Sequence, residues 1–122
     1  MTNSKLDYAE SFDEPACRAA LSAVMESLGC SLADCQSHKG CEPQRTYRQI
    51  ARMVAVERGF DAGVVADICG CSQSAVRSGQ QGIERRLERE RRMAGNGAAE
   101  HLLLPVVAKA RAAVANSKCT TS

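Results

Sequence analysis

Apolar residues recur three and four positions apart along most of the chain, and glycines or polar clusters interrupt this pattern at intervals. Such spacing is typical of amphipathic α-helices, each of which buries one face. It predicts a first helix from near Pro15 to Gly29, a short helix over residues 32–36 with Ser31 as its N-cap, and a third helix over residues 44–58. Residues 1–13 are polar and acidic and are expected to be disordered. The side chains predicted to face the core are Cys17, Ala20, Leu21, Val24, Met25 and Leu28 in the first helix and Tyr47, Ile50, Ala51, Val54 and Ala55 in the third, whereas Arg45, Arg48 and Arg52 are predicted to point outward.

Residues 61–81 have the pattern of two helices joined by a sharp turn. A helix from Ala62 to about Cys69 is expected to end at Gly70, because glycine readily adopts φ > 0. Ser72 is expected to cap a second helix that begins at Gln73 and continues to about residue 93. The small core between the two helices is predicted to contain Val65, Ile68, Cys69, Cys71 and Val76, and the outer face of the second helix to carry Gln73, Ser74, Arg77, Ser78 and Gln81. A helix-turn-helix with such a polar outer face is typical of proteins that read the major groove of DNA, and two packed helices that touch no nucleic acid are the alternative interpretation.

The C-terminal part begins with a glycine-rich break over residues 94–98. An apolar helix is predicted over residues 99–116, followed by a fraying tail over residues 117–122. If this helix starts at Ala98, Pro105 kinks it; if it starts at Leu104, Pro105 sits in its first turn at no energetic cost. The most apolar residues of this segment are expected either to cover the domain or to bind a partner, such as a second copy of the chain; they include Leu102, Leu103, Val106 and Val107.

Composition supports an all-α protein and leaves its ligand open. The chain has 122 residues, which fits one small domain, and only 3% of them are aromatic, with no Trp. The core must therefore consist of aliphatic, Met and Cys side chains. The formal net charge of +2 argues neither for nor against a nucleic-acid ligand. Residues 73–92 hold six Arg and three Glu, a local excess that fits either phosphate contacts or a solvated face of Glu–Arg pairs.

Candidate chemistry other than DNA binding is weakly supported. The cluster Cys30, Cys35, His38 and Cys41 contains the ligand types of a structural zinc site, although buried packing of the cysteines is the favoured interpretation and no metal is expected. The seven cysteines are expected to be mostly reduced thiols in a cytoplasmic protein, because no leader and no membrane-spanning run is evident. No catalytic arrangement and no phosphate loop of the GxxxxGK[ST] type is found, so neither an enzyme nor a cofactor is predicted.

From about Pro15 to Leu87 the chain resembles the C-terminal DNA-binding domain of the bacterial replication initiator DnaA. The resemblance is carried by LGCSLADCQS after the first helix, by Arg48-Gln49-Ile50-Ala51 in the third helix, and by Val76 followed by Ile83-Glu84 in the proposed recognition helix. It implies an all-α helix-turn-helix bundle, here with an extra C-terminal helix, and double-stranded DNA as ligand. It also implies that the recognition helix enters the major groove and that the loop before the third helix lies near the minor groove.

The chain departs from the family where the family reads DNA. The family signature Gly-Gly-Arg-Asp-His-Thr-Thr-Val corresponds to residues 70–76, which are one residue shorter and lack its Arg, Asp, His and both Thr. The basic Lys-Arg-Arg run of the family corresponds to His38-Lys39-Gly40. Because specific donors and acceptors carry base identity, these changes predict a different DNA target. The initiator's ATPase module is absent from this sequence, so the resemblance implies a stand-alone DNA-binding module of bacterial or phage type.

The leading hypothesis is thus a sequence-specific DNA-binding protein, either a transcriptional regulator or an accessory factor for replication or phage genes. The alternative is a protein-interaction module, for example for RNA polymerase or a partner regulator, that has lost strong DNA binding. Under the leading hypothesis, the expected base contacts are Gln73, Ser74, Arg77 and Ser78, with Arg77 best placed for a guanine, and the expected phosphate contacts are Lys39, Arg45, Arg48 and Ser72. Convergence of the basic residues on one positive face would favour DNA binding over the alternative.

Overall fold

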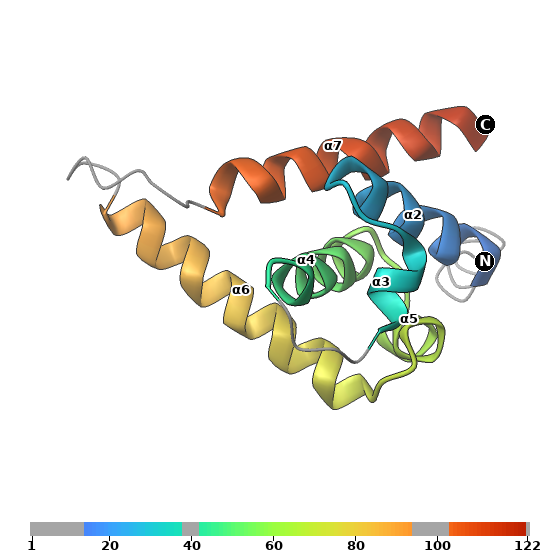
Figure 1. The fold of residues 1–122 in the computed structure, drawn as a ribbon, viewed down its shortest axis with the longest axis horizontal. Helices are drawn as coiled ribbons and strands as arrows, with labels where there is room; N and C mark the ends of the chain where they lie inside the picture. The colour runs from blue at the N-terminus through green and yellow to red at the C-terminus, as the bar shows by residue number, and fades with distance from the viewer. Residues whose placement is uncertain (1–13, 38–41, 94–102, 122) are drawn as a thin grey trace, which may run out of the picture.

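The computed structural model describes residues 14–37, 42–93 and 103–121, with side chains up to residue 115 (Figure 1). Every regular element in these ranges is an α-helix, which confirms the predicted all-α class. The helices are α2 (Glu14–Ser27), α3 (Leu32–Gln36), α4 (Gln44–Glu57), α5 (Ala62–Cys69), α6 (Gln73–Met93) and α7 (Leu104–Thr121). None of the helices in the described ranges is long and apolar enough to cross a membrane.

The central element is α4, which packs against α2, α3, α5, α6 and α7 (Figure 1). Ile50, Ala51, Val54 and Ala55 are buried as predicted, whereas Tyr47 is only half-buried. Met53 is fully buried and was not predicted to be. Because neighbours surround α4, it buries more than the single stripe that an amphipathic pattern reveals.

The first two helices agree closely with the prediction. The stripe of α2 buries five of its six predicted residues, and Leu28 lies half-buried just beyond its end. Gly29 then adopts a φ of 80°, which ends the helix, and the Cys30 N–H donates to the Met25 carbonyl at 2.8 Å. Ser31 begins α3, where its N–H donates to the Asp34 carboxylate at 2.9 Å. Local capping thus fixes both boundaries.

The pair α5 and α6 is joined by the predicted turn. The Asp61 carboxylate accepts the Gly63 N–H at 2.8 Å and caps α5. Gly70 ends that helix in the left-handed conformation, with φ 70° and ψ 35°. The Ser72 hydroxyl then accepts the Ala75 N–H at 3.0 Å and caps α6. Of the five side chains predicted between the helices, Val65, Ile68, Cys69 and Val76 are buried and Cys71 is half-buried.

The last helix starts at one of the two predicted positions and ends later than predicted. It spans Leu104–Thr121 (α7) instead of residues 99–116, so Pro105 lies in its first turn and does not kink it. The predicted break at residues 94–98 and the residues up to Leu102 lie outside the described ranges. The start of α7 is set by α6: the Glu90 carboxylate accepts the Leu103 N–H at 2.7 and 2.8 Å and the Leu104 N–H at 2.9 Å. Such an anion satisfies N–H groups that the helix cannot pair by itself and complements the positive end of its dipole.

One face of α7 covers the domain. Its buried residues, Leu103, Val107, Ala110 and Val114, follow helical spacing, and the helix packs mainly against α2 and also against α4 (Figure 1). Arg111 adds a two-pronged ion pair with Glu57 of α4, at 2.8 and 3.0 Å, and this pair raises the pKa of the guanidinium. Of the two alternatives that the sequence left open for this segment, Leu103 and Val107 follow the first and cover their own domain. Val106 is half-buried, and Leu102 lies outside the described ranges.

Glu90→Ala should lower the free energy of unfolding by about 1–2 kcal/mol, because it removes a charged cap from two backbone N–H groups. Chemical denaturation followed by circular dichroism measures this change. Glu88→Ala is the matched control, since Glu88 is exposed and, among the described residues, its ion pair is with Arg92 of the same helix at 3.0 Å. That exposed pair should contribute less than about 0.5 kcal/mol. Equal effects of the two substitutions would contradict the capping role of Glu90.

Candidate nucleic-acid interface

The outer face of α6 is polar and open to solvent. Val76, Ile83 and Leu87 form the buried stripe of this helix, and they fix which side faces outward. All five residues predicted on the outer face, Gln73, Ser74, Arg77, Ser78 and Gln81, are exposed, as is the capping residue Ser72. The four candidate base contacts are thus accessible to a ligand from the same side of the molecule's longest helix.

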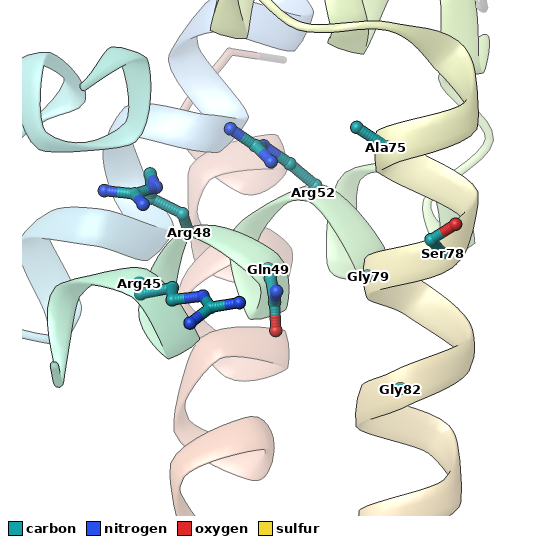
Figure 2. A pocket seen from close by; sticks show the side chains of 8 residues that line it. All are labelled: Arg45, Arg48, Gln49, Arg52, Ala75, Ser78, Gly79 and Gly82. Carbon is teal, nitrogen blue, oxygen red and sulfur yellow. The ribbon is translucent and has the colours of Figure 1, made fainter. Parts of the chain in front are cut away.

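A cleft of about 380 Å³ lies between α4 and α6, beside this outer face (Figure 2). One wall is the arginine side of α4, whose residues recur at helical spacing. The other wall consists of small residues of α6, so its backbone is nearly bare. The lining residues are Arg45, Arg48, Gln49 and Arg52 from α4 and Ala75, Ser78, Gly79 and Gly82 from α6. None of these lining residues is acidic, so the cleft carries three positive charges.

The two glycines of the α6 wall differ in their surroundings. A Cβ added at Gly79 would lie 3.2 Å from Cγ of Gln49, so the close approach of α6 to α4 explains a glycine at this position. A Cβ added at Gly82 would meet no atom within 4 Å. Packing therefore accounts for Gly79 but not for Gly82, which leaves open space in the cleft.

Arg48 does not point outward as predicted. Only 7% of it is exposed, because it lies on the face of α4 that neighbouring helices enclose. It nevertheless borders the cleft, so an anion would reach it from there and not from the open surface. Arg45 is exposed at the same cleft. Nearby, a hydrogen bond from the Thr46 hydroxyl at 2.6 Å and the charge of Arg45 lower the pKa of Glu42.

Arg52 is a site residue that sequence reasoning did not assign. It is half-buried, and its Nη2 donates to the Cys35 carbonyl at 3.4 Å. Its Nε is buried and has no hydrogen-bond partner among the described residues. The spacing of Arg45, Arg48 and Arg52 places them on one side of a helix, but only the position of α6 reveals that they share a cleft (Figure 2).

Cys35 and Cys69 face each other below Arg52, with 3.5 Å between their sulfur atoms, and both are fully buried. The hydrogen bond with Cys35 lowers the pKa of Cys69 to about 7, and the positive charges of Arg52 and Arg48 act in the same direction. The same hydrogen bond and burial raise the pKa of the Cys35 thiol.

This pairing bears on the weakly supported zinc cluster. The Cys35 thiol contacts Cys69 of α5, and the Cys30 thiol lies 3.9 Å from the Leu28 carbonyl. The other two members, His38 and Cys41, lie outside the described ranges. Among the residues that the structure describes, no group of three or more His, Cys, Asp or Glu side chains could hold a metal ion.

The structure brings together only part of the predicted DNA-binding set. Arg45, Arg48 and Ser78 share the cleft, whereas Arg77 lies outside its lining on the exposed face next to it. Lys39 lies outside the described ranges. Farther along α6, Arg92 pairs with Glu88 at 3.0 Å on the exposed surface, which fits the interpretation of a solvated face for that part of the helix.

Comparisons with protein-family models, with curated proteins and with solved structures gave no match to this chain. The function is therefore argued from the α6 face and the α4–α6 cleft.

Proposed function

We propose that this chain is a sequence-specific double-stranded DNA-binding protein that inserts the N-terminal half of α6 into the major groove. The observation that carries the proposal is the outer face of α6, where every described side chain from Gln73 to Ser78 other than Ala75 and the buried Val76 is polar and exposed. A capped helix N-terminus at Ser72 adds amide groups that favour a phosphate. The protein would act as a transcriptional regulator or as an accessory factor for replication or phage genes.

The roles of the side chains follow from their hydrogen-bonding groups. Arg77 has the two parallel donors that pair with guanine, and Gln73 has the donor and acceptor that pair with adenine. Ser74 and Ser78 accept or donate according to the base they meet. The exposed Arg45, beside the cleft, and Ser72 would hold backbone phosphates and set the register of α6. Lys39, in the loop before α4, would add a further phosphate contact.

The resemblance to the DnaA domain supports this proposal through residues that now have positions in the fold. In the matched run of α4, Ile50 and Ala51 are fully buried, and Gln49 packs against Gly79 of α6. These residues maintain the packing of α4 against its neighbours. The family's base-reading residues are replaced on the exposed face of α6, which supports a common bundle with a different DNA target.

The alternative function, a protein-interaction module, required an exposed apolar surface on the C-terminal segment. It relied on the apolar C-terminal segment, and α7 buries Leu103 and Val107 against its own domain. The lost reading residues of the family favour this alternative, whereas the exposed Arg77 on the outer face of α6 opposes it, and DNA binding is the function we propose.

Arg77→Ala should weaken binding to the cognate sequence about 10- to 100-fold, as expected for loss of one bidentate base contact. The stability of the domain should be unchanged, because Arg77 is exposed. The cognate sequence is first selected from random duplexes by the purified protein, and its affinity is then measured by fluorescence anisotropy at fixed salt.

Arg18→Ala is the matched control for this experiment. It removes the same charge from an exposed position on α2, where Arg18 forms an ion pair with Glu14 at 3.9 Å. Its effect should be limited to the weak, salt-dependent attraction that any lost charge causes. Equal losses for the two variants, or a selection that enriches no sequence, would contradict the proposed function.

A further inference from the structure

We infer that the cleft between α4 and α6 binds the terminal phosphoryl group of a small phosphorylated molecule. Its position behind the exposed face of α6 also makes it a regulatory site, a consequence that rests on the proposed DNA-binding function. The binding site itself depends only on the geometry of the cleft.

The first step concerns charge. Arg45, Arg48 and Arg52 all line the α4 side of the cleft, and no lining residue supplies a carboxylate. The whole chain has a formal net charge of only +2, so three charges in one cleft are a strong local concentration. Charges that are partly removed from solvent act more strongly than exposed ones, because water screens them less. An anion in the cleft would offset their mutual repulsion.

The second step concerns space. The opposite wall of α6 offers Ala75, Gly79 and Gly82 and therefore no large side chain. A glycine inside a helix lowers its stability, yet Gly82 has no packing neighbour that requires it. The resulting cleft of about 380 Å³ falls within the range of small-molecule sites. The wall is thus shaped to admit a ligand.

The third step concerns the kind of anion. Arg48 is only 7% exposed, and within the part of the chain that the structure describes the buried Nε atom of Arg52 has no hydrogen-bond partner. A terminal phosphoryl group can enter the cleft as far as these two arginines. A phosphodiester is held back, because it is joined to a nucleic-acid strand on both sides. A terminal phosphoryl group also carries a charge of about −2, which three guanidinium groups match better than the single charge of a diester. Arginine is the side chain best suited to such groups, because its donors pair with two oxygens at once.

The occupant would touch both α4 and α6 and would fix their relative position. Since α6 is the helix proposed to read DNA, occupancy of the cleft should change DNA affinity. By thermodynamic linkage, DNA should change the affinity for the phosphorylated ligand by the same factor.

The experiment uses pyrophosphate as the probe and the full chain. Isothermal titration calorimetry and thermal unfolding are measured in pyrophosphate and in sodium chloride of equal ionic strength. Wild type should show saturable binding and a higher Tm in pyrophosphate. Binding should weaken at least tenfold in Arg52→Gln, which removes one positive charge, and in Gly82→Leu, which fills the cleft and keeps every charge. Arg18→Gln, on α2, should bind like wild type.

The inference is supported if pyrophosphate binding saturates in wild type and is abolished in Gly82→Leu. If Arg52→Gln does not fold, Arg45→Gln, at an exposed position, repeats the test. Equal responses to pyrophosphate and chloride, or equal binding by all variants, would overturn it. The inference would also be overturned if the cleft substitutions weakened only the binding of duplex DNA. The group bound in the cleft would then be a backbone phosphate, and the proposed function would stand. Pyrophosphate binding by a protein that selects no DNA would leave the inference intact and contradict the proposed function.

Discussion

Val107→Asp should lower the free energy of unfolding by at least about 3 kcal/mol, the scale of a buried charge without a partner. Val107 is 1% exposed, on the face of α7 that packs against α2 and α4. A carboxylate at this position must either enter the core without an opposite charge or force α7 off the domain. Either outcome is destabilising, and urea denaturation followed by circular dichroism at 222 nm measures the loss.

Val106→Asp is the matched control, because it introduces the same charge one position earlier on the same helix. Val106 is half-buried, so its carboxylate can reach water and the loss should be below about 1.5 kcal/mol. If α7 were an undocked helix reserved for a partner, neither substitution would change stability. That pair of results would refute the packing of α7 described above.

Met53→Ala should lower the free energy of unfolding by about 2–5 kcal/mol, the range for truncating a fully buried long side chain. Met53 is 0% exposed and lies on α4, which five other helices surround. The substitution leaves a cavity in the middle of the bundle that rigid neighbours fill only in part. The same urea titration measures the effect.

Val56→Ala serves as the comparison, three residues farther along α4. Val56 is only partly buried against the core, so truncation should cost less than about 1.5 kcal/mol. A small effect at Met53, similar to that at Val56, would show that α4 has one open side and is not the centre of the bundle.

The helix boundaries that the sequence predicted correctly are those set by neighbouring residues. Asp61 and Ser72 cap helices through their own side chains, and the Asp34 carboxylate accepts the N–H of the N-cap residue Ser31. Gly70 ends α5 through its own backbone conformation. The start of α7 depends instead on Glu90, thirteen and fourteen positions away from the N–H groups it accepts. No local pattern indicates such a contact, so two start positions remained open.

In the candidate site, too, some features follow from the local sequence and others depend on contacts between distant residues. Exposure of Arg77 and its neighbours follows from the apolar stripe of α6, which the sequence displays. Burial of Arg48 and Met53 does not, because periodicity identifies one buried face and cannot show that a helix is enclosed on several. The arginine cleft likewise requires α6 to place Gly79 and Gly82 opposite Arg52. The contact between Cys35 and Cys69 joins residues 34 positions apart and had no signal in the sequence.

The packing of α7 against α2 has a consequence for how the chain folds as it is synthesised. The apolar stripe of α2, including Leu21 and Val24, leaves the ribosome early, but its main cover on one side is α7, which emerges after every other described helix (Figure 1). Non-local contacts of this kind form late, and surface that awaits them is prone to aggregate. The nascent chain therefore exposes its α6 face in a half-closed domain, and the core closes only once α7 is released.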